Sequence, residues 1–144
     1  MKLTEIQEEW KKDSELDRTE LGEEALRIPK LHSKYWNIYC AERAAARALQ
    51  EEYNILYRDK YQYYNGTIDE DTLRERQWAP NPLKILRADS SIFLDADKEL
   101  QAAKNKAEFA TDKLKFIEDV IKSLSPRGYN IRAAIDWQKF MSGQ

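Results

Sequence analysis

A long, uninterrupted pattern of apolar residues dominates the second half of the chain. From Phe93 to Leu124 an apolar side chain recurs after alternating steps of three and four residues, and the positions between are largely Lys, Asp, Glu and Gln. This heptad pattern predicts a helix with a narrow apolar stripe that partner helices must cover. The stripe consists of Phe93, Ala96, Leu100, Ala103, Ala107, Ala110, Leu114, Ile117, Ile121 and Leu124.

A second long helix is predicted in the first half of the chain. No Gly or Pro occurs from Lys30 to Tyr64, and the middle of this segment is rich in alanine. Asn65-Gly66 follows, and glycine commonly caps a helix in the left-handed conformation. Alanines in both segments would allow close approach, so we expect the two long helices to pair antiparallel.

Shorter helices are expected at both ends of the chain. The sequence Thr4-Glu-Ile-Gln7 has the form of a capping box, for a helix that ends near Ser14. Proline breaks helices, so Pro29 and Pro126 are interpreted as boundaries, and Pro82 as a first-turn residue capped by Asn81. The predicted helical segments are 1–28, which Thr19 divides, then 30–65, 83–125 and 130–141.

The predicted fold class is all-α, with residues 1–144 forming one domain. Two long helices with narrow stripes enclose little core, and the terminal helices also need apolar partners. Self-association of several copies would cover these surfaces, and a monomeric helical bundle is the alternative.

The residue types present favour a binding protein over an enzyme. The four glycines are scattered and form no phosphate-binding loop, and His32 is the only histidine. Cys40, the only cysteine, excludes an internal disulfide and is typical of a reducing compartment such as the cytoplasm. Carboxylate pairs such as Asp95 and Asp97 are expected on solvent-facing helix positions, so we predict no metal and no cofactor. No apolar run is long enough to cross a membrane.

The stretch 53–66 combines tyrosines with cations. Tyr53, Tyr57, Tyr61 and Tyr64 share one helical face, and Arg58 and Lys60 lie beside it. Such a surface suits unpaired bases and their phosphates. Packing of the tyrosines against another helix is the alternative, and it is favoured for Tyr53 and Tyr57.

Arg43 and Arg47 are further cations on the same helix. They are four residues apart and therefore share a face. They are candidate DNA contacts, although pairing with nearby glutamates is the simpler interpretation.

Several segments, in their order and spacing, resemble the UvsY family of recombination mediators of tailed bacteriophages. The resemblance extends over essentially the whole chain. The segments are Leu3-Thr-Glu-Ile-Gln-Glu-Glu, Leu31-His-Ser-Lys-Tyr-Trp36, Arg58-Asp-Lys-Tyr-Gln-Tyr-Tyr-Asn-Gly66, Leu86-Arg-Ala-Asp89, Arg127-Gly-Tyr-Asn-Ile-Arg132 and Lys139-Phe140.

The resemblance implies a specific function. Members of this family are all-helical, assemble into rings and are not enzymes. They bind single-stranded DNA, the phage recombinase and the phage single-stranded-DNA-binding protein in the cytoplasm of the bacterial host. They load the recombinase onto coated DNA during recombination, repair and replication. A homo-oligomer, hexamer or heptamer, is the implied assembly.

The resemblance also implies site residues. The family's Lys-x-Arg DNA-binding pair corresponds to Arg58 and Lys60, with the two residue types exchanged. Arginine's planar fork and lysine's point charge are not equivalent, so the geometry of the contact is expected to differ. Tyr61 and Tyr64 adjoin this pair. Oligomerisation is implied for Leu114, Ile117, Ile121, Leu124, Ile131, Ile135 and Phe140.

Two other functions are compatible with parts of the pattern. A non-catalytic coiled-coil scaffold or adaptor that binds only proteins would need the same apolar stripe. A metal-dependent nuclease could be built from the carboxylates. The net charge of −2 argues against a general nucleic-acid binder, so DNA binding would depend on local cations repeated in an oligomer.

Overall fold

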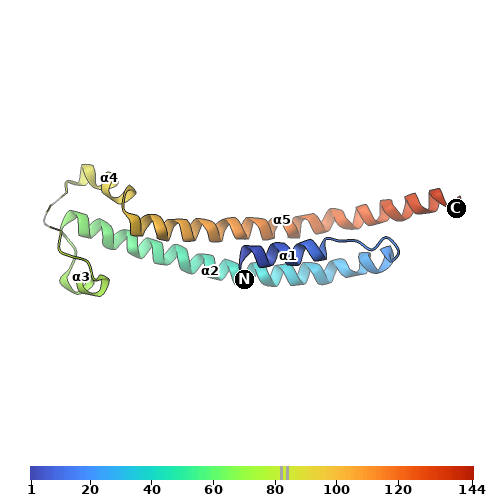
Figure 1. Ribbon diagram of the computed structural model, residues 1–144, viewed down its shortest axis with the longest axis horizontal. Helices are drawn as coiled ribbons and strands as arrows, with labels where there is room; N and C mark the ends of the chain where they lie inside the picture. Colours follow the sequence, from blue (N-terminus) through green and yellow to red (C-terminus); the bar gives the residue numbers. More distant parts are fainter. Residues whose placement is uncertain (82, 84) are drawn as a thin grey trace. The chain divides into compact units, whose positions relative to one another are not determined.

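The computed structural model describes residues 1–81, 83 and 85–144. These residues form helices and turns, with no strand among them, which confirms the all-α prediction. The helices are α1 (Leu3–Asp13), α2 (Leu21–Asn65), α3 (Glu70–Arg76), the 3₁₀ turn η1 (Arg87–Asp89), α4 (Ser90–Asp95) and α5 (Lys98–Met141) (Figure 1).

The chain divides into two compact units, and α2 and α5 contribute to both. Residues 1–44 and 111–144 form the first unit, and residues 45–110 form the second. Within the first unit, Glu24 pairs with Arg127 and Glu42 with Lys113, so the two helices run antiparallel. They are also antiparallel in the second unit, where Lys60 pairs with Asp97 (Figure 1).

The core of the first unit contains one residue from α1 and several from each long helix. Trp10 packs edge-on against Tyr35, with ring centroids 5.4 Å apart. Helix α1 thus covers the apolar stripes of α2 and α5, which are too narrow to enclose a core by themselves. The buried residues of this cluster are Ile6, Leu31, Tyr35, Ile117, Val120 and Leu124.

The predicted heptad stripe is confirmed over most of its length. From Leu100 to Leu124 every stripe position is buried or half-buried. Phe93 and Ala96 are exceptions, because α5 begins only at Lys98 and both side chains are exposed. Leu94 of α4 is buried in their place.

The break predicted at Pro29 is wrong, because α2 continues through it. A proline inside a helix costs about 3 kcal/mol. Asp13 helps to hold the two sides of Pro29 in line, since it pairs with Arg27 before the proline and with Lys34 after it. Buried apolar residues on both sides, Leu21 and Leu31, lie on the face that packs into the first unit.

The boundary predicted at Pro126 is also wrong. Helix α5 runs through Pro126, and the segment 130–141 is its last part. Arg127 follows this proline and is buried, donating hydrogen bonds to the carbonyls of Asp13 and Glu15 and pairing with Glu24. Contacts made by residues that follow each proline therefore offset the free-energy cost of a proline inside the helix.

The connection between the long helices differs from the prediction. Asn65-Gly66 ends α2 as expected, with a φ of 73° at Gly66. The short helix α3, capped by the side chain of Asp69, was not anticipated. Leu83, Ile85 and Leu86 are not helical, and the predicted role of Pro82 lies outside the described residues.

The first helix begins differently from the prediction. The expected capping box at Thr4 is wrong, because the Lys2 N–H donates to Glu5 Oε2 at 2.8 Å and α1 starts at Leu3. No helix among the described residues is long and apolar enough to span a membrane.

Asp13 provides a test of how the first unit is held together. Burial alone would raise the pKa of Asp13, but hydrogen bonds from Lys34 and Tyr35 outweigh it and lower the pKa. A carboxylate with a lowered pKa in the folded state stabilises the fold above its unfolded pKa, and the contribution is lost as pH falls through the folded pKa.

We expect Asp13→Ala to lower the free energy of unfolding by about 2 kcal/mol at neutral pH and by less below about pH 3, measured by urea unfolding. An equal loss at both pH values would contradict this role.

Candidate functional site

The tyrosine- and cation-rich stretch lies at the end of α2, where the chain turns sharply. The N–H of Thr67 donates to the carbonyl of Gln62 at 2.9 Å, and Gly66 supplies the left-handed residue. The Ser90 hydroxyl donates to Asn65 Oδ1 at 3.0 Å. The turn therefore holds the end of α2 against the start of α4 within the second unit.

Lys60 is buried, with a side chain only 7% exposed. Its ammonium lies 3.0 Å from Asp97 Oδ2, 3.4 Å from Glu99 Oε1, and 4.2 Å from the centre of the Trp78 ring. Trp78 in turn donates its indole N–H to the same Glu99 oxygen at 3.0 Å. Its ammonium is therefore already paired with two carboxylates. The DNA contact predicted for Lys60 stays a prediction.

Asp97 connects this network to the start of α5. The predicted solvent-facing position of Asp97 is wrong: it is buried, because it accepts the Leu100 N–H that opens α5 and the Tyr64 hydroxyl. Burial would raise the pKa of Asp97, but the hydrogen bonds from Tyr64, Leu100 and Lys60 lower it. Burial and the same carboxylate raise the pKa of Tyr64.

Arg58 has a different environment from Lys60. Its side chain is 64% exposed, and its guanidinium contacts Asp59, whose carboxylate is almost fully buried. Arg76 also binds Asp59, through two hydrogen bonds of 2.9 and 2.7 Å. Two guanidinium groups thus share the carboxylate of Asp59, and that of Arg58 lies on the exposed side.

The tyrosines divide into packed and exposed groups. Tyr64 is packed, with its hydroxyl on Asp97 and its ring 5.9 Å from Phe93. Tyr53 is half-buried and contacts Tyr57 at 6.1 Å between ring centres. Tyr57 and Tyr61 are exposed. Two aromatic rings in the last part of α2 are therefore accessible to a ligand.

The other predicted DNA contacts are not gathered at this site. Arg43 and Arg47 are both exposed, but Arg43 belongs to the first unit and Arg47 to the second.

The predicted oligomerisation residues are similarly divided. Ile117, Leu124 and Ile131 are buried inside the first unit, whereas Phe140 is 70% exposed. Leu114, Ile121 and Ile135 are half-buried.

Sequence reasoning missed most of the residues that hold Arg58 and Lys60 in place. These partners are distant in the sequence, and no local motif marks them. One signal was available: the three- and four-residue steps through Leu49, Tyr53 and Leu56 continue to position 60, which places Lys60 on the packed face. The missed residues are Asp59, Arg76, Trp78, Asp97 and Glu99.

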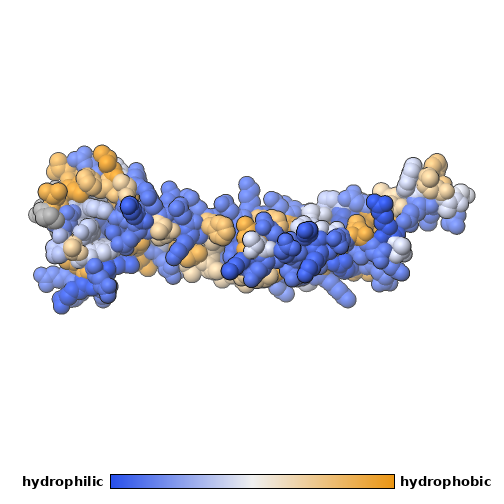
Figure 2. Space-filling view, viewed as in Figure 1, coloured by the Kyte–Doolittle hydropathy of each residue, from blue (hydrophilic) through white to orange (hydrophobic). Residues whose placement is uncertain are grey.

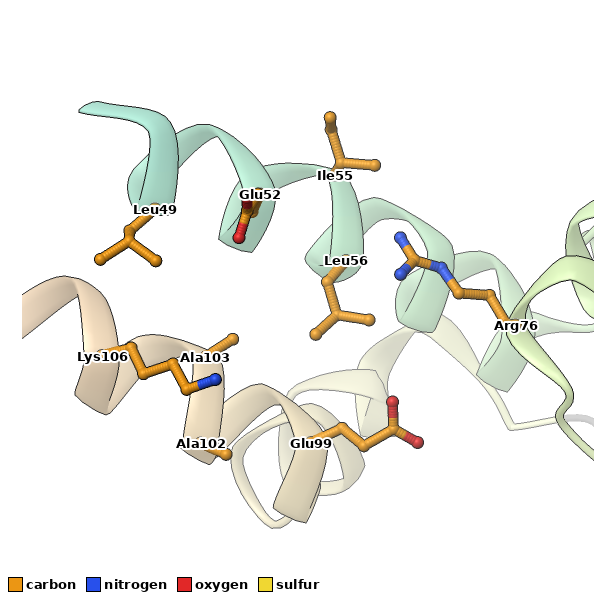
Figure 3. A pocket seen from close by; sticks show the side chains of 9 residues that line it. All are labelled: Leu49, Glu52, Ile55, Leu56, Arg76, Glu99, Ala102, Ala103 and Lys106. Atoms are coloured by element: carbon orange, nitrogen blue, oxygen red, sulfur yellow. The ribbon is translucent and has the colours of Figure 1, made fainter. Parts of the chain in front are cut away.

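An open groove of about 500 Å³ lies beside this network in the second unit (Figure 3). Leu49 and Leu56 of α2 face Ala103 of α5 across it, and Arg76 and Glu99 border one end. No group of three His, Cys, Asp or Glu side chains in the described part of the chain is placed to hold a metal ion.

Comparisons with known proteins identify the family. Residues 9–144 match the family described as "Recombination, repair and ssDNA binding protein UvsY". The recombination protein uvsY of Enterobacteria phage T4 is 24% identical over 144 residues, which cover 100% of both chains.

Crystal structures of the bacteriophage T4 recombination mediator protein UvsY share the fold. The lattice type IV structure has a TM-score of 0.84 at 24% identity, covering 97% of this chain and 99% of that one. The lattice type II structure has a TM-score of 0.84 at 23% identity, with coverage of 99% and 98%. The chain therefore belongs to the UvsY family of recombination, repair and single-stranded-DNA-binding proteins.

Proposed function

We propose that this protein is a phage recombination mediator that binds single-stranded DNA as a homo-oligomer. In this role it loads a strand-exchange recombinase onto DNA coated by single-stranded-DNA-binding protein. Family membership supports the proposal. The structural observation behind it is the exposed guanidinium of Arg58, whose carboxylate partner is shared with Arg76.

We infer different roles for the two predicted cations. Arg58 contacts the phosphate backbone, because its side chain is exposed and its neighbour Asp59 is also paired with Arg76. Lys60 positions the site, because its ammonium joins α2 to Asp97 and Glu99 at the start of α5. Tyr57 and Tyr61 flank Arg58 and provide exposed rings for bases.

Repetition of the site in an oligomer explains how a protein with a net charge of −2 binds DNA. One phosphate contact per subunit is weak, but contacts made in parallel on one strand add up to tight binding. Exposed apolar residues offer surfaces for self-association. They gather around α4 at Leu83, Leu86, Ile92 and Phe93, and at the end of α5 at Trp137, Phe140 and Met141 (Figure 2).

Loss of Arg58 should weaken DNA binding while the fold is kept. We expect Arg58→Ala to reduce affinity for a labelled single strand about tenfold or more at low salt, since every subunit loses a phosphate contact. Fluorescence anisotropy measures this. Arg74→Ala is the matched control, because Arg74 is an exposed arginine of the second unit that pairs only with its neighbour Asp71 among the described residues. Equal affinities of wild type and Arg58→Ala would contradict the assignment, and no binding by wild type would favour the protein-only scaffold.

The same variants test the mediator role itself. Wild type should restore recombinase ATP hydrolysis on strands coated with the single-stranded-DNA-binding protein, and Arg58→Ala should do so only poorly. If wild type binds DNA but gives no such stimulation, the protein is a DNA-binding protein without mediator activity.

Replacement of Lys60 should act mainly on stability. Lys60→Ala leaves Asp97 buried without its cation, and breaking a buried pair costs about 3 kcal/mol or more. Arg58→Ala, at an exposed pair, should cost less than about 1 kcal/mol. Urea unfolding of both variants gives the comparison. Similar small losses in both would show that Lys60 does not hold the site together.

Substitution of Phe140 tests the predicted oligomerisation surface without disturbing the core of the subunit. Because its ring is exposed, Phe140→Asp should leave the helical content unchanged and lower the oligomeric mass measured by light scattering. Leu26→Asp, at another exposed apolar position of the first unit, is the control. An unchanged mass in Phe140→Asp would exclude this position from subunit contacts.

A further inference from the structure

Helix α2 carries a row of aromatic rings in the first unit, in which Tyr39 packs against the core and Trp36 is exposed. The rings of His32 and Trp36 are nearly parallel, at 9°, with centres 6.4 Å apart. Trp36 and Tyr39 follow at 25° and 5.5 Å. Trp36 is 48% exposed, although an indole gains most from burial. Three flat faces are thus arranged in series along one helix.

Two depressions lie beside these rings. One, of about 240 Å³, is lined by Trp36, Tyr39 and Ile121 together with charged residues. The other, of about 510 Å³, includes His32 and shares Ile121 with the first. The smaller depression is a groove between α2 and α5 within the first unit, and Trp36 and Tyr39 border it.

The charge of this groove is positive. Arg43 and Lys122 line it, both are exposed, and neither side chain has an ion pair or hydrogen bond to any described residue. The one carboxylate in the lining, Glu118, accepts the Tyr39 hydroxyl at 3.0 Å. This bond also fixes the Tyr39 ring, so two free cations flank an ordered row of rings.

We propose that this groove is a second contact for single-stranded DNA, in which a base stacks on Trp36 and phosphates pair with Arg43 and Lys122. The inference rests on the proposed function of the chain. Rings in series with flanking cations suit planar bases on an anionic backbone. An acidic peptide would form ion pairs with the two cations, but its side chains would not stack on the parallel rings as bases do.

The two contacts differ in chemistry, which allows them to be separated. Arg58 binds phosphate whether or not a base is attached, whereas stacking on Trp36 requires the base. Affinities for an oligothymidine and for an abasic strand of equal length therefore report on the two contacts differently.

We expect Trp36→Ala to weaken oligothymidine binding at least about fivefold and to leave binding of the abasic strand unchanged. Arg58→Ala should weaken both.

Matched variants support the comparison. Tyr129→Ala removes another exposed ring of the first unit and should change neither affinity. Trp36→Phe retains a flat ring and should recover much of the oligothymidine affinity. A strand carrying 5-iodouracil should form a photochemical adduct on the peptide that contains Trp36.

Four results would overturn the inference. Two concern affinity: Trp36→Ala binds oligothymidine as tightly as wild type, or it loses the same affinity for the oligothymidine and the abasic strand. The third is a change in the oligomeric mass of Trp36→Ala. The fourth is binding of a labelled oligoglutamate peptide to wild type that Trp36→Ala abolishes. Each leaves the proposed function intact if wild type still binds DNA through Arg58. Failure of wild type to bind either strand would instead contradict the proposed function.

Discussion

The apolar stripe of each long helix is narrow, and the charged residues at its edges must find partners within the subunit. A buried charge without a partner costs several kcal/mol, on the order of the whole stability of a small domain. The structure meets this requirement with ion pairs that join different helices. Asp13 binds Lys34, Glu42 binds both Lys113 and the N-terminal amine, and Lys60 binds Asp97.

This pairing determines which cations remain exposed and without an ion pair across helices. Lys60 lies on the packed face of α2 and is neutralised there, whereas Arg58 lies two residues earlier and faces outward. Arg43 and Lys122 of the first unit also have no partner among the described residues. In the mediator role that we propose, these few outward cations bind phosphate in a chain of negative net charge because several copies act on one strand.

The sequence predicted the features that depend on local pattern. The stripe from Leu100 to Leu124 and the stop at Asn65-Gly66 follow from residue spacing and backbone preference, and both are present. Pro29 and Pro126 were misread, because local preference opposes a helix there and only packing with distant residues maintains it.

The site was harder to predict for a similar reason. Arg58 and Lys60 have the same charge in the same short motif, and their different partners depend on the fold. Lys60 pairs with Asp97 and Glu99 at the start of α5, whereas Arg58 contacts its neighbour Asp59, which Arg76 of α3 also binds. The spacing of Leu49, Tyr53 and Leu56 places Lys60 on the packed face of the helix. The tyrosines at 57, 61 and 64 follow a second face and indicate that one as the packed face instead.

The salt dependence of DNA affinity tests most directly whether Arg58 is the phosphate contact and Lys60 its support. Each phosphate neutralised on a single strand contributes about 0.7 to the slope of log affinity against log salt. We predict that Arg58→Ala lowers this slope by about 0.7 for each subunit engaged on the strand, while Lys60→Met, which keeps the length of the side chain, leaves the slope of the folded protein unchanged. A slope that is unchanged in Arg58→Ala and reduced in folded Lys60→Met would contradict the account.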